Sequence, residues 1–208
     1  MTLKTYGVAK GLATKIHRPG TAEAKTEQKI RDGSKTSDSF NEEELYWIKG
    51  PMGRGLQLEP TGKYVAFCAG TGALVFLDLV AHLIIKNSMP ADQVPAEIAK
   101  YYAPGFKFHL YCSFMSRDQA IGLDLIEALV DLNKALGLDN FEATVRLSVT
   151  EGPKLPRWTP EYIESELSGK ALQKVWVCGP PAVNEMFDKT LGDLKDKLNL
   201  KAHQIDVM

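Results

Sequence analysis

Residues 64–72 read Tyr-Val-Ala-Phe-Cys-Ala-Gly-Thr-Gly, an apolar run that stops at a glycine turn and opens an amphipathic helix. More than a hundred residues later, residues 175–181 repeat this design as Val-Trp-Val-Cys-Gly-Pro-Pro. In an open parallel sheet such strand ends lie side by side at the carboxyl edge, where backbone N–H groups at a helix start can hold a pyrophosphate. The two segments therefore predict a cleft for a dinucleotide.

The pattern of the chain after residue 45 predicts the fold class. Short apolar strands alternate with helical periods along this part of the sequence. The predicted strands are 64–68, 106–113, 141–149, 174–178 and 203–207, and the predicted helices are 72–87, 118–136, 160–168 and 182–198. Such alternation is typical of a doubly wound parallel sheet. We therefore expect an α/β domain over residues 46–208 with a five-stranded parallel sheet.

Length and composition indicate an ordinary soluble globular protein. The chain has 208 residues, of which 44% are hydrophobic and 25% charged, and its formal net charge is -1. Since there is no basic excess, we expect no nucleic-acid partner. No apolar run approaches the roughly 20 residues that span a bilayer, so we expect no transmembrane segment.

The first 45 residues are interpreted as a separate N-terminal segment. Residues 21–44 are rich in Lys, Glu, Asp, Ser and Thr, and have too few apolar side chains to order themselves, which is typical of an insertion or linker. The first 22 residues hold three lysines, one arginine and no acid, which is similar to a mitochondrial presequence. A mitochondrial presequence usually also contains serine and further arginines, which these residues lack. We expect an intracellular protein, either cytoplasmic or mitochondrial.

Three cysteines, Cys68, Cys112 and Cys178, lie in or at the end of apolar runs. An odd, sparse set without close spacing fits neither a disulfide framework nor a zinc site. The sequence therefore predicts a reducing compartment and no metal site, with Cys68 and Cys112 in the core.

A third glycine-rich element precedes the predicted sheet. Residues 49–53 read Lys-Gly-Pro-Met-Gly after a predicted short strand at 45–48, and alone they would be a linker turn. The chain resembles the ferredoxin reductase superfamily in three elements and in their order: this turn, then Ala69-Gly70-Thr71-Gly72, then Cys178-Gly179-Pro180-Pro181. The likeness is greatest to the NAD-binding module of the cytochrome b5 reductase and ferric reductase type. It covers residues 45–208.

The resemblance implies a role for each matching residue. Gly70, Thr71 and Gly72 would bind the pyrophosphate of the nicotinamide nucleotide. Cys178, with Gly179-Pro180-Pro181 after it, would lie beside the nicotinamide where hydride passes to flavin. Ser116 and Arg117 match the adenosine-side loop of the family less closely. The usual Gly-Gly-Thr-Gly-x-x-Pro of the family departs here to Ala-Gly-Thr-Gly-Ala-Leu-Val over residues 69–75.

Two roles stay open for Cys178. A thiol of ordinary pKa, about 8.5, is mostly protonated at neutral pH and would orient the nicotinamide as a polarisable wall rather than act as a nucleophile. The alternative is a small hydrophobic side chain buried at a strand end.

The superfamily carries an upstream flavin-binding barrel, whose phosphate-binding strand has no match here. Gly11-Leu12-Ala13-Thr14 resembles a later step of that barrel, and a random turn is the alternative. If the match is real, residues 1–45 are a remnant of the flavin domain. NADH is the expected nucleotide, because residues 147–151 at the end of the third strand include one acid and no arginine. NADPH is the alternative through Arg117.

Two functions follow. In the first, this is the nicotinamide-nucleotide part of a flavin-dependent oxidoreductase, which passes hydride from NADH to FAD held by a missing or partner domain. Electrons would then reach a one-electron acceptor such as a haem protein. In the second, the chain is a flavin-less nucleotide-binding or structural subunit of a larger assembly.

Overall fold

A computed structural model describes residues 55–149 and 157–208 of this chain. The chain divides into two units, Met1–Gly55 and Leu56–Met208, and all the elements below belong to the second. Gly11, Thr14, the predicted strand at 45–48 and the turn at 49–53 lie outside the described residues. The predicted domain boundary near residue 45 stays a prediction.

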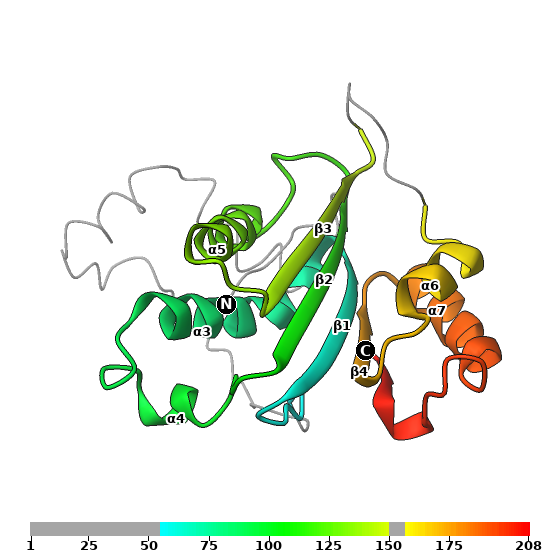
Figure 1. Ribbon diagram of the computed structural model, residues 1–208. Coiled ribbons are helices and arrows are strands. Elements are labelled where there is room, and N and C mark those ends of the chain that lie inside the picture. Colours follow the sequence, from blue (N-terminus) through cyan, green and yellow to red (C-terminus); the bar gives the residue numbers. More distant parts are fainter. Residues whose placement is uncertain (1–54, 150–156) are drawn as a thin grey trace, which may run out of the picture. The chain divides into compact units, whose positions relative to one another are not determined.

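Five parallel strands form one sheet in the order β3-β2-β1-β4-β5 (Figure 1). This confirms the predicted five-stranded parallel sheet. The strands are β1 (Gly62–Ala69), β2 (Phe106–Phe114), β3 (Phe141–Leu147), β4 (Leu172–Cys178) and β5 (Ile205–Val207). β1 lies at the centre and is buried on both faces, which is why it reads as a continuous apolar run rather than an alternating one.

Helices cover both faces of the sheet, as in a doubly wound fold (Figure 1). Helices α3 (Leu74–Ser88) and α5 (Leu123–Leu136) lie on one face, and α6 (Pro160–Leu167) and α7 (Pro181–Leu194) on the other. A single turn, α4 (Ala96–Ala99), follows α3. The chain therefore crosses from one face to the other after β3, as a doubly wound sheet requires.

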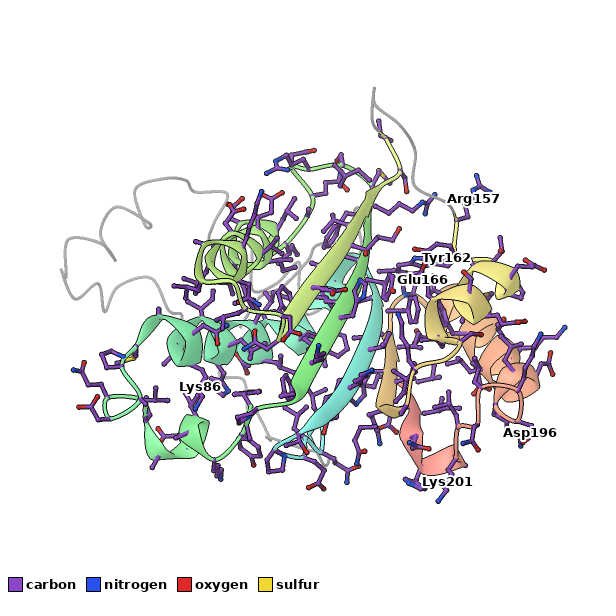
Figure 2. All side chains as sticks on the ribbon, in the orientation of Figure 1. Lys86, Arg157, Tyr162, Glu166, Asp196 and Lys201 are labelled. Atoms are coloured by element: carbon purple, nitrogen blue, oxygen red, sulfur yellow. The ribbon has the colours of Figure 1, made fainter. Side chains whose placement is uncertain are left out.

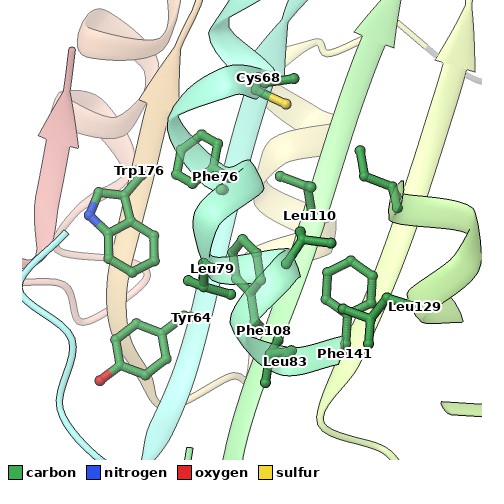
Figure 3. Packing of buried hydrophobic residues seen from close by; sticks show 14 of the residues in the cluster. Tyr64, Cys68, Phe76, Leu79, Leu83, Phe108, Leu110, Leu129, Phe141 and Trp176 are labelled. Atoms are coloured by element: carbon green, nitrogen blue, oxygen red, sulfur yellow. The ribbon is translucent and has the colours of Figure 1, made fainter. Parts of the chain in front are cut away.

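Each face of the sheet has its own hydrophobic core. Under α3 and α5, Trp176 stacks on Tyr64 with ring centroids 5.4 Å apart, and Phe76 and Phe108 fill the space beside them (Figure 3). On the other face, Phe67 stacks on Tyr111 and contacts Phe187 of α7. Both clusters use aromatic side chains from β1 and β2, and β4 adds Trp176 to the first.

Tyr111 also ties the sheet to α6. Its hydroxyl donates a hydrogen bond to Glu166 Oε2 at 2.5 Å, and Figure 2 shows Glu166 and Tyr162 on α6. Burial, followed by the bond to Glu166, raises the pKa of Tyr111. The phenol therefore stays protonated and keeps donating over the whole neutral range.

Several element limits differ from those predicted. The helix predicted at 118–136 begins only at Leu123, because Gly122 takes a left-handed φ of 76° and residues 116–121 form turns. Helix α7 ends at Leu194 rather than at 198. The strand predicted at 203–207 is shortened to Ile205–Val207 by a 3-10 turn, η4 (Ala202–Gln204), and β3 ends at Leu147.

Within the described residues, one helical stretch meets the length and composition of a membrane span. Gly70–Ser88 has 19 residues, and an 18-residue window within it has a mean hydropathy of 1.3, so the expected absence of a transmembrane segment stays a prediction. Phe76, Leu79, Val80 and Leu83 of this stretch pack into the core under the sheet. The core helix of a soluble protein and a membrane span pass the same test, so composition alone does not separate them.

Candidate functional site

The two segments that carry the dinucleotide prediction meet at one point of the sheet. From β1 the chain goes outward to β2 and β3, whereas β4 and β5 lie on the other side of β1. The gap between the carboxyl ends of β1 and β4 is therefore the topological switch point, where ligands bind in open α/β sheets. Cys68 of β1 and Cys178 of β4 are register partners there, so the two glycine turns begin side by side.

The turn after β1 touches the end of β4 backbone to backbone. A Cβ atom on Gly72 would lie 2.0 Å from the carbonyl oxygen of Cys178 and 2.6 Å from its carbonyl carbon. A Cβ on Gly179 would lie 3.1 Å from that of Ala69. Only glycine permits this approach at position 72, so the sequence brings the two turns together as one surface.

Gly70 and Gly72 serve different purposes. Gly70 has a left-handed φ of 56°, and no heavy atom of the described residues lies within 4 Å of where its Cβ would be. The sequence pattern assigns both glycines to the approach of a pyrophosphate. In the structure, the position that a side chain on Gly72 would take lies against β4 instead, whereas Gly70 lies at the open side of the turn.

Both helices that start at this point lack the usual N-terminal partners. The turn η3 (Gly70–Ala73) runs directly into α3, and neither η3, α3 nor α7 has a side-chain cap from the described residues or an acid in its first turn. By contrast, α6 is capped by Thr159 and carries Glu161, and α5 carries Asp124. Uncapped N–H groups with the positive end of the helix dipole attract an anion.

This arrangement fits a dinucleotide pyrophosphate. The turn η3 and the start of α7 at Pro181 lie beside each other at the same edge of the sheet, and neither carries an acid in its first turn. Pro180 and Pro181 fix the φ angle of the second turn, so its shape is set before a ligand arrives. The structure thus brings together Gly70, Thr71, Gly72, Cys178, Gly179, Pro180 and Pro181 among the predicted site residues.

Cys178 lies half-buried at the end of β4. Burial raises the pKa of its thiol, so the group is neutral at physiological pH. A neutral thiol can contact a flat ring as a polarisable surface, and it is a weak nucleophile. Cys68 and Cys112 are fully buried, in agreement with their assignment to the core. Among residues 55–149 and 157–208, no group of three His, Cys, Asp or Glu side chains could hold a metal ion.

Ser116 and Arg117 follow β2 and lie in a turn closed by a bond from the Gln119 N–H to the Ser116 carbonyl. The Arg117 guanidinium makes a forked ion pair with Glu127 of α5, with N···O distances of 2.9 and 2.5 Å. Hydrogen bonding to Glu127 raises the pKa of Arg117. A 2′-phosphate that used Arg117 would have to displace Glu127, which sequence reasoning missed because the two residues are ten positions apart.

The first turn of α7 holds another residue that the sequence pattern did not single out. Asn184 donates a hydrogen bond from Nδ2 to the carbonyl oxygen of Met208, whose own N–H bonds to Val177 O at 2.9 Å. Its Oδ1 atom is buried and has no hydrogen-bond partner among the described residues. Asn184 therefore connects the start of α7, through Met208, to β4 next to Cys178. No motif in the sequence indicates this contact.

No protein-family model and no curated protein sequence matches the chain. Among solved structures, the CS-b5R domains of human Ncb5or in the NAD+ form are similar over 77% of this chain and 40% of that one, with 18% identity and a TM-score of 0.50. Flavohemoglobin from Malassezia yamatoensis is similar over 74% of this chain and 33% of that one, with 18% identity and a TM-score of 0.48. The chain thus spans less than half the length of either protein. The described part has the fold of a ferredoxin reductase-like NAD(P)-binding module.

Proposed function

We propose that this domain binds NADH in the crevice between η3 and the start of α7, as the nicotinamide-nucleotide part of a flavin-dependent oxidoreductase. One observation carries the proposal. The backbone of Gly72 abuts Cys178 O, so two uncapped helix starts face one site at the switch point of the sheet. The NAD+ form of human Ncb5or, which shares this fold, supports the choice of nucleotide.

The residues of the crevice would divide the work of binding. Backbone N–H groups of residues 70–73 would donate to the pyrophosphate, and the left-handed turn at Gly70 leaves room for that approach. Cys178 would form a neutral wall against the nicotinamide ring, since its thiol keeps its proton. Pro180 and Pro181 would hold that wall in place.

Bound NADH would supply a hydride to FAD held by another domain or a partner, and the electrons would then pass to a one-electron acceptor such as a haem protein. Such a transfer needs no acid or base from this chain at the donor carbon. What the domain would contribute is proximity and orientation, which depend on a rigid site. Aromatic side chains on β1, β2 and β4 supply that rigidity beneath the crevice.

NADH is proposed over NADPH because Arg117 is engaged by Glu127. This pair is exposed and therefore weak, so Glu127 competes with a 2′-phosphate for the guanidinium but does not block it.

Two measurements on the full chain test the proposal. Calorimetry should show binding of one NADH, and an absorption spectrum of the purified chain should show no flavin bands. In an assay that supplies a flavin-bearing domain, Cys178→Ala should lower the hydride-transfer rate about 10- to 100-fold and leave NADH affinity nearly unchanged, because positioning slips. Absence of NADH binding would refute the proposal. Flavin retained by the chain through gel filtration would show that residues 1–208 hold a flavin site of their own.

A further inference from the structure

Three thiols form a row across the sheet, next to the proposed site. Cys112 of β2 is the register partner of Cys68 of β1, and Cys68 is the register partner of Cys178 of β4. Register partners on parallel strands place their side chains on the same face of a sheet. All three belong to the core on the α3 side, where Figure 3 shows the Cys68 sulfur.

Neighbouring members of this row are close enough to bond. The sulfurs of Cys68 and Cys112 lie 3.3 Å apart. Adjacent strands are about 4.8 Å apart, inside the range of about 4.4 to 6.8 Å that joins the Cα atoms of disulfides. The same spacing holds between Cys68 and Cys178. The Cys68 and Cys112 sulfurs need to approach by only about 1.3 Å to form a disulfide, and Cys178 is the next residue along the row.

The row cannot gather around a metal ion. Cys112 and Cys178 are two strand spacings apart, about 9.6 Å, whereas thiolates that share one zinc ion must each come within about 2.3 Å of it. The chemistry open to these thiols is pairwise.

Burial changes along the row. Cys112 and Cys68 are fully buried, whereas Cys178 is half-buried at the end of β4. An oxidant in solution would therefore meet Cys178 first. Thiol–disulfide exchange between neighbouring sulfurs would then pass the oxidation from Cys178 to Cys68 and on to Cys112.

We propose that Cys68 and Cys112 are an oxidation site, a buried dithiol that a hydroperoxide converts to a disulfide through Cys178. Hydrogen peroxide first oxidises the Cys178 thiol to a sulfenic acid and leaves as water. The Cys68 thiol then forms a disulfide with Cys178 and releases a second water. Cys112 attacks the Cys68 sulfur, and Cys178 departs with the proton as a free thiol. In total, two thiols and one peroxide give one disulfide and two waters.

The buried pair is the end of this sequence because its sulfurs are already in contact and are shielded from reductants in solution. Burial raises the pKa of Cys178, so only a small fraction is thiolate at neutral pH. The oxidation rate should therefore increase about tenfold per pH unit above neutrality, as the thiolate fraction does.

The link to function rests on the proposed function. Cys68 lies two residues before Gly70, so a bond to Cys112 acts directly below the turn that would hold the pyrophosphate. A nicotinamide against Cys178 would in turn cover the thiol through which oxidation enters. Saturating NAD+, which does not reduce peroxide, should slow oxidation at least tenfold.

Peptide mapping of the full chain tests the proposal. Trypsin places the three cysteines on separate fragments, 64–86, 108–117 and 175–189. The chain is treated with hydrogen peroxide without nucleotide, and remaining thiols are alkylated before digestion. We expect a mass loss of about 2 Da, a link between 64–86 and 108–117, and an alkylated Cys178.

Two variants test the order of the proposed oxidation steps. Cys112→Ser should stop at a link between 64–86 and 175–189. Cys178→Ser should slow oxidation of the native chain at least tenfold, but not that of the same chain unfolded in urea. Circular dichroism checks that each variant is folded, and the wild-type map does not depend on either.

The proposal is overturned if the native wild-type chain forms no link between Cys68 and Cys112. It is also overturned if Cys178→Ser is oxidised as fast as wild type. If the link forms and NAD+ does not slow it, the oxidation site stands and the placement of nicotinamide at Cys178 fails.

Discussion

Replacing Gly72 by alanine tests whether the contact between the two turns builds the site. The added Cβ would lie 2.0 Å from Cys178 O, and ordinary contact begins at 3.4 Å, so the turns must separate by roughly 1.4 Å. Overpacking of this kind costs about 3 kcal/mol of unfolding free energy. A displacement of about 1 Å in a positioning element lowers turnover by about 100-fold, and we expect NADH affinity to fall as well, because the turn moves away from the pyrophosphate.

Two glycines provide matched controls. Gly70 and Gly137 have similar left-handed φ angles, 56° and 65°, and neither would bring a Cβ within 4 Å of a heavy atom of the described residues. Alanine at either position should cost about 1 kcal/mol of backbone strain. Only Gly70 lies at the crevice, so NADH affinity should fall in Gly70→Ala and stay unchanged in Gly137→Ala.

Urea denaturation followed by circular dichroism gives the stabilities, and calorimetry gives the NADH affinities. The reasoning is refuted if Gly72→Ala is no less stable than Gly137→Ala, because the turns would then not be in contact. A Gly72→Ala chain that loses stability but binds NADH normally would separate the contact from the binding site.

Three further changes test other parts of the structure. Arg117→Ala should leave NADH affinity unchanged, and NADPH binding that is tighter than NADH in wild type and disappears in this variant would contradict the assignment of Arg117 to Glu127. Asn133→Ala removes buried hydrogen bonds to Asn87 and Asn140, and should lower the unfolding free energy by about 1 to 3 kcal/mol in urea denaturation. Burial lowers the pKa of His109, so the folded chain binds fewer protons than the unfolded one below an ordinary pKa of about 6.5. Its contribution to stability is present above that pH and is lost as the pH falls, so urea midpoints should drop less steeply with acid in His109→Gln.

Most of the sheet is predictable from the sequence because each strand has a recognisable local sequence pattern. The runs that became β1 and β4 are apolar, short and closed by glycine turns, which is the local pattern of a buried parallel strand. The start of α5 was wrong because the left-handed φ of Gly122 breaks a pattern that otherwise looks helical. The spacing of apolar residues along the sequence does not show the φ angle of one glycine.

The site is predictable only in part, because its geometry depends on strand order. That Gly70-Thr71-Gly72 and Cys178 belong to one crevice follows from their positions at strand ends. That Gly72 packs against Cys178 O does not follow, because it requires β4 to lie beside β1. Glu127 and Asn184 find their partners through the same tertiary arrangement, and leave no trace in the local sequence.

The bare starts of α3 and α7 set limits on how stable this domain can become. A cap such as Thr159 on α6 is worth about 1 kcal/mol to its helix. The two helix starts at the crevice go without one, so the ligand-free domain is less stable than its architecture allows. A serine or aspartate selected there for thermal tolerance would place its side-chain oxygen where an anion would bind. Engineering this domain for heat resistance at those positions would therefore trade ligand affinity for stability, whereas α5 and α6 can be optimised freely.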